Sequence, residues 1–204
     1  MNLANKLTIF RMILVPIFVI VGYLGMKQII NGAFFGVATV FWLMDLIFII
    51  ASITDKLDGY IARSRNQVTT FGKFLDPLAD KILVLSALIM LVEFYKIPAW
   101  VPIIVLTREF LVSGYRLIAA DKGQVIAASF WGKLKTVTQM LAIIMTIVDR
   151  FPFMAFIFNP DKDFFYAYNV VSSVLLIISV IATIFSGWDY LKNGKELFKE
   201  GTNE

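Results

Sequence analysis

The sequence predicts an all-α integral membrane protein with six transmembrane helices around a polar cavity that faces the cytoplasm. Hydrophobic residues make up 59% of the 204 residues and charged residues only 17%, whereas soluble domains are about 25% charged. This composition excludes a soluble globular enzyme, a disordered chain and a nucleic-acid-binding protein. The length is that of one domain, so we expect residues 1–204 to form a single membrane domain.

Six apolar stretches are long enough to be transmembrane helices, which need about 20 mostly apolar residues. They are residues 8–26, 33–54, 74–95, 98–119, 134–151 and 164–188. Short polar breaks separate them, which leaves no room for a soluble domain. No small-residue cleavage site follows the first stretch, so we do not expect it to be a removed signal peptide.

The distribution of positive charge predicts the orientation, because cytoplasmic loops are enriched in Lys and Arg. Six spans put both termini on one side of the membrane. That side carries 14 of the 19 Lys and Arg residues, against four on the other side and Arg108 within a span. We therefore expect a multi-pass protein of the cell membrane with both termini in the cytoplasm.

Four aspartates meet at the predicted cytoplasmic ends of the second and third helices. Asp55 and Asp58 are three residues apart, a spacing that places both on one face of a helix. Asp76 and Asp80 are four residues apart and share a face in the same way. The linker 63–72 lets the two helices pair antiparallel, which brings the carboxylates together. Because neighbouring carboxylates repel one another, such a cluster needs cations.

The chain contains no His and no Cys, so any metal must be held by oxygen ligands, which suit Mg²⁺ or Mn²⁺. Four carboxylates can bind two such ions about 4 Å apart, a spacing suited to phosphoryl transfer. Gly59 and Ala62 leave the helix surface open to a phosphate or nucleotide. Arg63 can neutralise a phosphate, and Gly72 lets the linker close against the site.

A single D-x-x-D is usually a solvated helix end, and Lys56, Lys73 and Lys81 are alternative ion-pair partners for these acids. The full pattern D-x₂-D-G-x₂-A-R-x₈-G-x₃-D-x₃-D is far more specific, since chance gives it on the order of once in 10¹⁰ starting positions. It resembles the signature of the CDP-alcohol phosphatidyltransferase family, and the likeness in length and predicted helices covers essentially the whole chain. Members transfer a phosphatidyl group from CDP-diacylglycerol to an alcohol and release CMP.

The resemblance implies a role for each matched residue. Asp55, Asp58 and Asp76 are implied ligands of two Mg²⁺ or Mn²⁺ ions. Asp80 is implied to be the general base and a further metal ligand. The implied nucleotide-binding residues are Gly59, Ala62, Arg63 and Gly72. A homodimer in membrane lipid, with no nucleic-acid partner, is also expected.

A weaker match lies at the N-terminus, where Asn5, Thr8 and Arg11 recur at three-residue spacing on one helical face. Family members often pack such a segment beside the CDP site, so Asn5 and Thr8 are candidate CDP-binding residues. The alternative is an ordinary helix start at the membrane interface, with the Arg11 side chain extended toward the lipid headgroups.

Basic residues outside the signature suggest a site for an anionic acceptor. Arg108, Arg116 and Lys135 can form a basic pocket for its phosphate. The alternative for Arg108 is an internal ion pair with its neighbour Glu109. Asp45 and Glu93 have no assigned role.

The stretches TREFLVSGYR and GKLKT-x-x-Q are similar to those of the bacterial branch of the family whose acceptor is glycerol 3-phosphate. This similarity implies formation of phosphatidylglycerophosphate and CMP in phospholipid biosynthesis. Inositol phosphate satisfies the same charge argument, and inositol, serine and phosphatidylglycerol are further acceptors left open. A membrane transporter is a remote alternative, disfavoured because the acids cluster at one interface rather than at the midplane.

Overall fold

Helices make up most of the described chain, which confirms the all-α prediction. The computed structural model describes residues 3–64, 70–121, 123, 129–158 and 163–193, apart from the side chains of residues 3–4, 56, 58–64, 70–77 and 193. The long helices are α1 (Leu3–Met26), α2 (Thr39–Ser64), α3 (Thr70–Glu93), α4 (Trp100–Asp121), α5 (Phe130–Val148) and α6 (Phe164–Asn193). The shorter elements are β1 (Ala33–Phe34), β2 (Val37–Ala38) and the single turn η1 (Ala155–Ile157).

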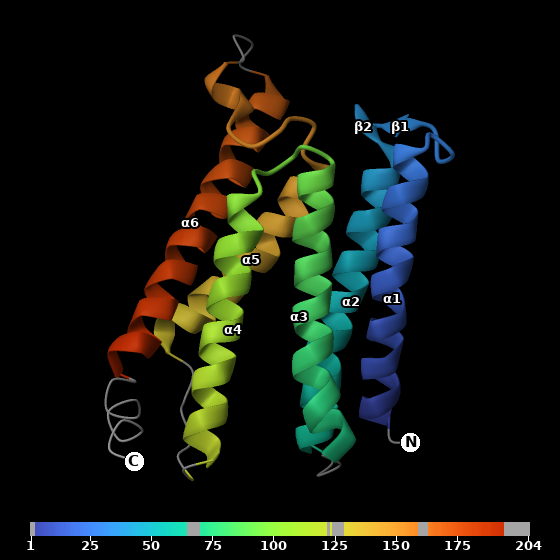
Figure 1. Cartoon of the computed structure of the whole chain (residues 1–204). Coiled ribbons are helices and arrows are strands. Elements are labelled where there is room, and N and C mark those ends of the chain that lie inside the picture. Colours follow the sequence, from blue (N-terminus) through green and yellow to red (C-terminus); the bar gives the residue numbers. More distant parts are fainter. Residues whose placement is uncertain (1–2, 65–69, 122, 124–128, 159–162, 194–204) are drawn as a thin grey trace.

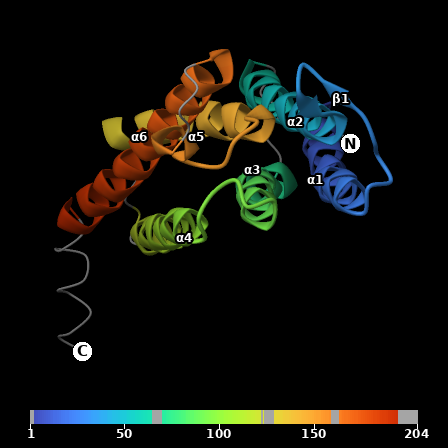
Figure 2. The ribbon, with the colours of Figure 1, turned by 90° about the horizontal axis from the view of Figure 1, so that it is seen from above.

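The start of α1 and the end of α6 lie at one end of the helix bundle (Figure 1). We call this the proximal end and the opposite end the distal end. Seen from above, α3 lies between α4 and the pair formed by α1 and α2, and α5 extends between α6 and α2 (Figure 2). α1 packs against α2 and α3, α5 packs against α6 and α2, and α4 packs against α6. α2 ends and α3 begins at the proximal end, so the parts of these two helices that carry the signature aspartates both lie toward this end.

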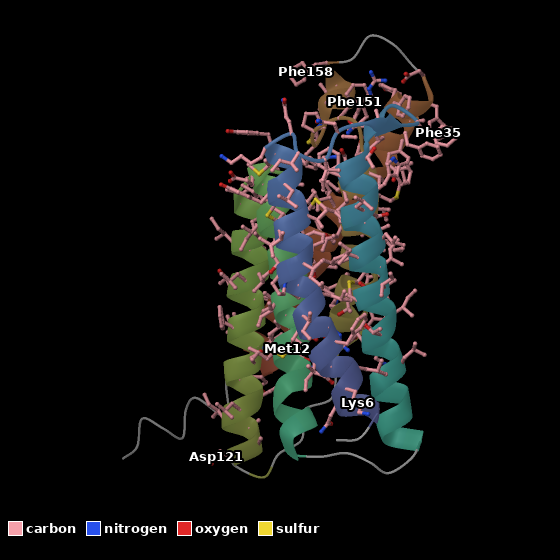
Figure 3. All side chains as sticks on the ribbon, turned by 90° about the vertical axis from the view of Figure 1, so that its right-hand side faces the viewer. Lys6, Met12, Phe35, Asp121, Phe151 and Phe158 are labelled. Atoms are coloured by element: carbon pink, nitrogen blue, oxygen red, sulfur yellow. The ribbon has the colours of Figure 1, made fainter. Side chains whose placement is uncertain are left out.

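Two of the described helices are long and apolar enough to cross a membrane, Asn5–Met26 and Phe164–Lys192. Their outward surfaces carry large apolar side chains, as a lipid-facing surface does. At the distal end, Phe35, Phe151 and Phe158 lie far from Lys6 and Asp121 at the proximal end (Figure 3).

Close helix packing holds α1 against α2 and α3. Phe18 and Phe48 are fully buried, with ring centroids 6.4 Å apart. A Cβ atom at Gly25 would lie 2.4 Å from a methyl carbon of Val40. Only glycine permits so close an approach of the two backbones, a device common between membrane helices. The same packing places the start of α1 beside the acid-bearing end of α2.

The prediction of one helix over residues 33–54 is wrong at its start, where the chain forms a β-hairpin instead. β1 and β2 pair antiparallel, and the two turn residues Phe35 and Gly36 have φ angles of 49° and 73°. A two-residue hairpin turn requires positive φ at both positions, and glycine adopts this conformation without strain. The indole nitrogen of Trp42 donates a hydrogen bond to the Phe34 carbonyl and anchors the hairpin on α2.

The last turn of α5 ends in a cap supplied by a distant lysine. Lys96 lies in the α3–α4 connection and is only 6% exposed. Its ammonium donates to the carbonyls of Ile147 at 2.9 Å and Asp149 at 2.5 Å, and it lies 3.8 Å from the centroid of the Phe41 ring. Burial lowers the pKa of Lys96 to about 8, and the nearby negative charge of Asp149 opposes the shift. The fifth span was predicted to end at residue 151, but α5 ends at Val148 because the chain leaves the helix after this residue.

We predict that Lys96→Met destabilises the fold, because the carbonyls at the end of α5 lose their charged donor. A charge-assisted hydrogen bond contributes about 2 kcal/mol, so thermal unfolding in detergent should occur several degrees lower. Lys27→Met is the matched control, since Lys27 is exposed at the same end and the one side-chain interaction described for it is with the Tyr23 ring. Equal midpoints for the two variants would contradict the capping role.

Candidate active site

Two of the four signature aspartates have described side chains, and they lie on neighbouring helices. Asp55 is near the end of α2 and its side chain is 32% exposed. Asp80 is on α3, half-buried, and within electrostatic range of Asp55. The backbones of Asp58 and Asp76 belong to α2 and α3, but their side chains lie outside the described residues. Within the described part, therefore, no group of three metal-binding side chains is found.

The predicted nucleotide-binding residues also include some with described side chains and some without. Gly59, Ala62, Arg63 and Gly72 lie in helix segments whose side-chain surroundings are outside the described residues. Their backbones place them at the proximal end, on the last turns of α2 and the first turn of α3. Asn5 and Thr8 are described, and both are buried on α1 with contacts to the rest of the chain.

Arg11 connects α1 to the acidic end of α2. Its side chain is completely buried, and its Nη1 atom lies 2.5 Å from the Asp55 carboxylate. A guanidinium in this position does not extend to the lipid headgroups, so that alternative for Arg11 is wrong. The ion pair places a positive charge beside a predicted metal ligand and explains why an arginine can be buried in α1.

A cavity of about 1170 Å³ opens between α3, α4 and α5. It contains Asp80 together with all three residues predicted to bind the acceptor phosphate, Arg108, Arg116 and Lys135. The other described lining residues are Lys81, Val84, Glu109, Val112, Ser113, Leu117, Ala120, Gly132, Lys133, Thr136, Val137, Gln139 and Met140. The fold thus joins one signature aspartate to basic side chains that are up to 55 residues away in sequence.

Glu109 offsets part of the positive charge of this cavity. Its Oε1 atom lies 2.5 Å from the Lys135 ammonium and 3.0 Å from Nη1 of Arg108. Arg108 is therefore both a partner in an internal ion pair and a lining residue of the cavity, which combines the two interpretations of its sequence context. Because the acid shares its charge between two cations, the cavity keeps a net positive charge available for an anion.

Several cavity residues have no counterpart among the predicted site residues. The ammonium of Lys81 donates to the hydroxyl of Ser113, one helical turn after Glu109. Gln139 is 3% exposed, and its Nε2 atom has no hydrogen-bond partner among the described residues. The spacing of Lys135 and Gln139, four residues apart on α5, is the signal that places both on one face.

Comparison with known proteins identifies the family. The model of the family described as CDP-alcohol phosphatidyltransferase matches residues 1–185. The chain belongs to the CDP-alcohol phosphatidyltransferase family. It is a membrane protein with the family's signature, and the cavity described above opens beside that signature.

Three relatives that share one name align with this chain over nearly their whole length. The CDP-diacylglycerol–glycerol-3-phosphate 3-phosphatidyltransferase of Bacillus subtilis is 41% identical over 202 residues, which is 97% of each chain. The Haemophilus influenzae protein of that name is 38% identical and covers 95% of this chain and 94% of its own. The Wigglesworthia glossinidia protein is 36% identical and covers 95% and 99%.

We predict that Lys135→Met lowers stability because it removes the shorter of the two ion pairs of Glu109. The cost should be about 2 kcal/mol, since a half-buried carboxylate loses a charged partner. Adding Glu109→Gln should recover part of the loss, because the acid no longer needs that partner. Thermal unfolding in detergent measures both effects, with Lys133→Met as the exposed control on α5. If the second change deepens the loss, the pair is not the source of the effect.

Proposed function

We propose that this phosphatidyltransferase transfers the phosphatidyl group of CDP-diacylglycerol to sn-glycerol 3-phosphate, giving phosphatidylglycerophosphate and CMP. The observation that carries this proposal is the cavity that joins Asp80 to Arg108, Arg116 and Lys135. The signature beside it supports the CDP-linked donor, and the basic wall supports a phosphorylated acceptor. The relatives named for this reaction favour glycerol 3-phosphate over inositol phosphate.

The carboxylates at the ends of α2 and α3 suit two divalent cations. Asp55 on α2 and Asp80 on α3 repel each other electrostatically, and the chain has no His or Cys to offer softer ligands. This donor set fits Mg²⁺ or Mn²⁺, and Asp55, Asp58, Asp76 and Asp80 would hold the ions. When bound, the ions supply positive charge that stabilises the diphosphate and the leaving CMP.

Asp80 is the proposed general base. Its carboxylate lines the cavity, so an acceptor hydroxyl bound there lies within its reach. Asp80 takes the proton of the glycerol 1-hydroxyl as that oxygen attacks the β-phosphorus, the one that carries diacylglycerol. A new P–O bond forms to glycerol, the P–O bond to CMP breaks, and CMP leaves with the bonding electron pair. Arg63, Gly59, Ala62 and Gly72, with Asn5 and Thr8, form the proposed nucleotide side of the site.

The basic residues of the cavity form the proposed binding site for the phosphate of the acceptor. Glycerol 3-phosphate is a dianion, and arginine binds phosphate oxygens with paired N–H groups in a fixed geometry. Arg108, Arg116 and Lys135 surround the cavity on α4 and α5, across from Asp80 on α3. A phosphate held by these cations leaves the far end of a three-carbon acceptor directed toward the aspartate side.

The distribution of Lys and Arg residues along the chain supports an orientation in the membrane. We propose six spans, with the proximal end in the cytoplasm, because most Lys and Arg residues belong to that side. Water-soluble glycerol 3-phosphate then enters the cavity from the cytoplasm while the lipid tails of the donor stay in the bilayer. We propose a single domain over residues 1–204 that forms a homodimer.

CMP release by the purified protein in detergent tests the proposed reaction. We expect CMP with CDP-diacylglycerol, Mg²⁺ and glycerol 3-phosphate, but not with serine, inositol or inositol phosphate. EDTA should abolish release, and added Mg²⁺ or Mn²⁺ should restore it. CMP formed with a different alcohol would retain the donor site and reject the acceptor. Failure with every alcohol, in protein that unfolds cooperatively, would reject the reaction.

We predict that Asp80→Asn reduces CMP release by at least about 100-fold, the usual contribution of a general base. The change preserves the size of the side chain, so the thermal unfolding midpoint should stay within a few degrees of the wild-type value. Asp121→Asn is the control, because Asp121 is exposed at the end of α4. Activity within fivefold of the wild type in the Asp80 variant would remove Asp80 from the mechanism.

A further inference from the structure

The C-terminal part of α6 touches both arginines of the cavity. Nη2 of Arg108 donates a hydrogen bond to the Ser186 hydroxyl at 2.5 Å, and Nη2 of Arg116 donates to the Tyr190 hydroxyl at 2.6 Å. Ser186 is completely buried and Tyr190 is 4% exposed. Neither residue lines the cavity, so both reach it only through the guanidinium groups.

The Tyr190 ring contacts the two guanidinium groups together. Its centroid lies 5.4 Å from Cζ of Arg116 and 5.8 Å from Cζ of Arg108, within the range of a cation–π interaction. Tyr115 of α4 packs edge-on against the same ring, with centroids 5.9 Å apart. The ring is therefore fixed from one side by packing and presents its polar atom and its face to the arginines.

Two glycines form a narrow slot for Arg108. A Cβ atom at Gly187 would lie 3.5 Å from Cγ of Arg108, and one at Gly132 would lie 3.4 Å from its Nη2. Within the described chain Nε of Arg108 has no hydrogen-bond partner although it is buried. An immobilised guanidinium with an unused N–H group is suited to receive a ligand oxygen.

We propose that Ser186 and Tyr190 position Arg108 and Arg116 for the acceptor phosphate, so that the end of α6 sets the affinity of the enzyme for its acceptor. This inference rests on the proposed function, because it takes the cavity as the acceptor site. Arginine side chains have many rotamers, and holding them before the ligand arrives lowers the entropic cost of binding. Both positioning residues lie beyond residue 185, where the match to the family model ends, which suits a property that varies with the acceptor.

Kinetics of three variants test the proposal, with KM for each substrate measured separately. Ser186→Ala and Tyr190→Phe each remove one hydrogen bond to a charged group, so KM for glycerol 3-phosphate should rise roughly tenfold. Tyr190→Leu also removes the aromatic face and should have a larger effect. In all three, kcat and KM for CDP-diacylglycerol should stay within about twofold of the wild type, and inorganic phosphate should become a weaker inhibitor to the same degree.

Ser179→Ala is the matched control. Ser179 is a buried serine two turns earlier on α6, and its hydroxyl bonds to the Leu176 carbonyl of its own helix. It should leave both KM values unchanged. An unchanged KM for glycerol 3-phosphate in Ser186→Ala and Tyr190→Phe would overturn the proposal. Parallel changes in both KM values with a lower unfolding midpoint would also overturn it, since they indicate a structural role.

The direct dissociation constant separates this inference from the proposed function. Titration calorimetry with glycerol 3-phosphate requires no turnover, and Tyr190→Phe should weaken binding roughly tenfold, as one lost charged hydrogen bond implies. If the wild type binds glycerol 3-phosphate but releases no CMP, the proposed reaction is wrong. The positioning role then stands if Tyr190→Phe weakens binding of glycerol 3-phosphate and fails if it does not. If CMP is released and the constant is unchanged in the variant, the positioning role is wrong.

Discussion

The Glu109 carboxylate lies among apolar helices with the charged groups of Arg108 and Lys135. Burying one charge without a partner costs far more than burying a hydrogen-bonded pair, so this acid allows basic groups to remain inside the bundle when no substrate is present. The same constraint applies on α1, where the buried Arg11 meets Asp55. One ion pair thus joins α1 to α2, and another joins α4 to α5.

These pairs divide the site into an acidic and a basic part, and Asp80 lies between them. Asp80 is within electrostatic range of Asp55 and Arg11 on one side and of Lys135 and Glu109 on the other. The acidic part, which needs cations, therefore lies next to the basic part, which needs an anion, and the charges of the two parts do not neutralise each other. A helix bundle can achieve this because each half comes from different helices.

Local spacing predicted the acid-bearing helix ends, because three- and four-residue intervals place side chains on one face whatever surrounds the helix. The cost of a charge inside an apolar segment marked Arg108, and Arg116 and Lys135 were grouped with it because all three are basic; the structure places them around one cavity. Ser186 and Tyr190 carry no such mark, because serine and tyrosine are common in membrane helices and their partners are more than 70 residues away. The hairpin at residues 33–38 was missed because its residues are as apolar as those of the helix that follows.

The distal end of the bundle is tied by hydrogen bonds that cross between loops and helices. Lys96 joins the α3–α4 connection to the end of α5, and Asp149 accepts hydrogen bonds from Asn169 and Ser172 of α6. A transporter must open to each side of the membrane in turn, and here every such cycle would break this buried network. In the proposed reaction, therefore, the distal end can stay closed, and water-soluble substrate and product enter and leave at the proximal end while the lipids exchange with the bilayer.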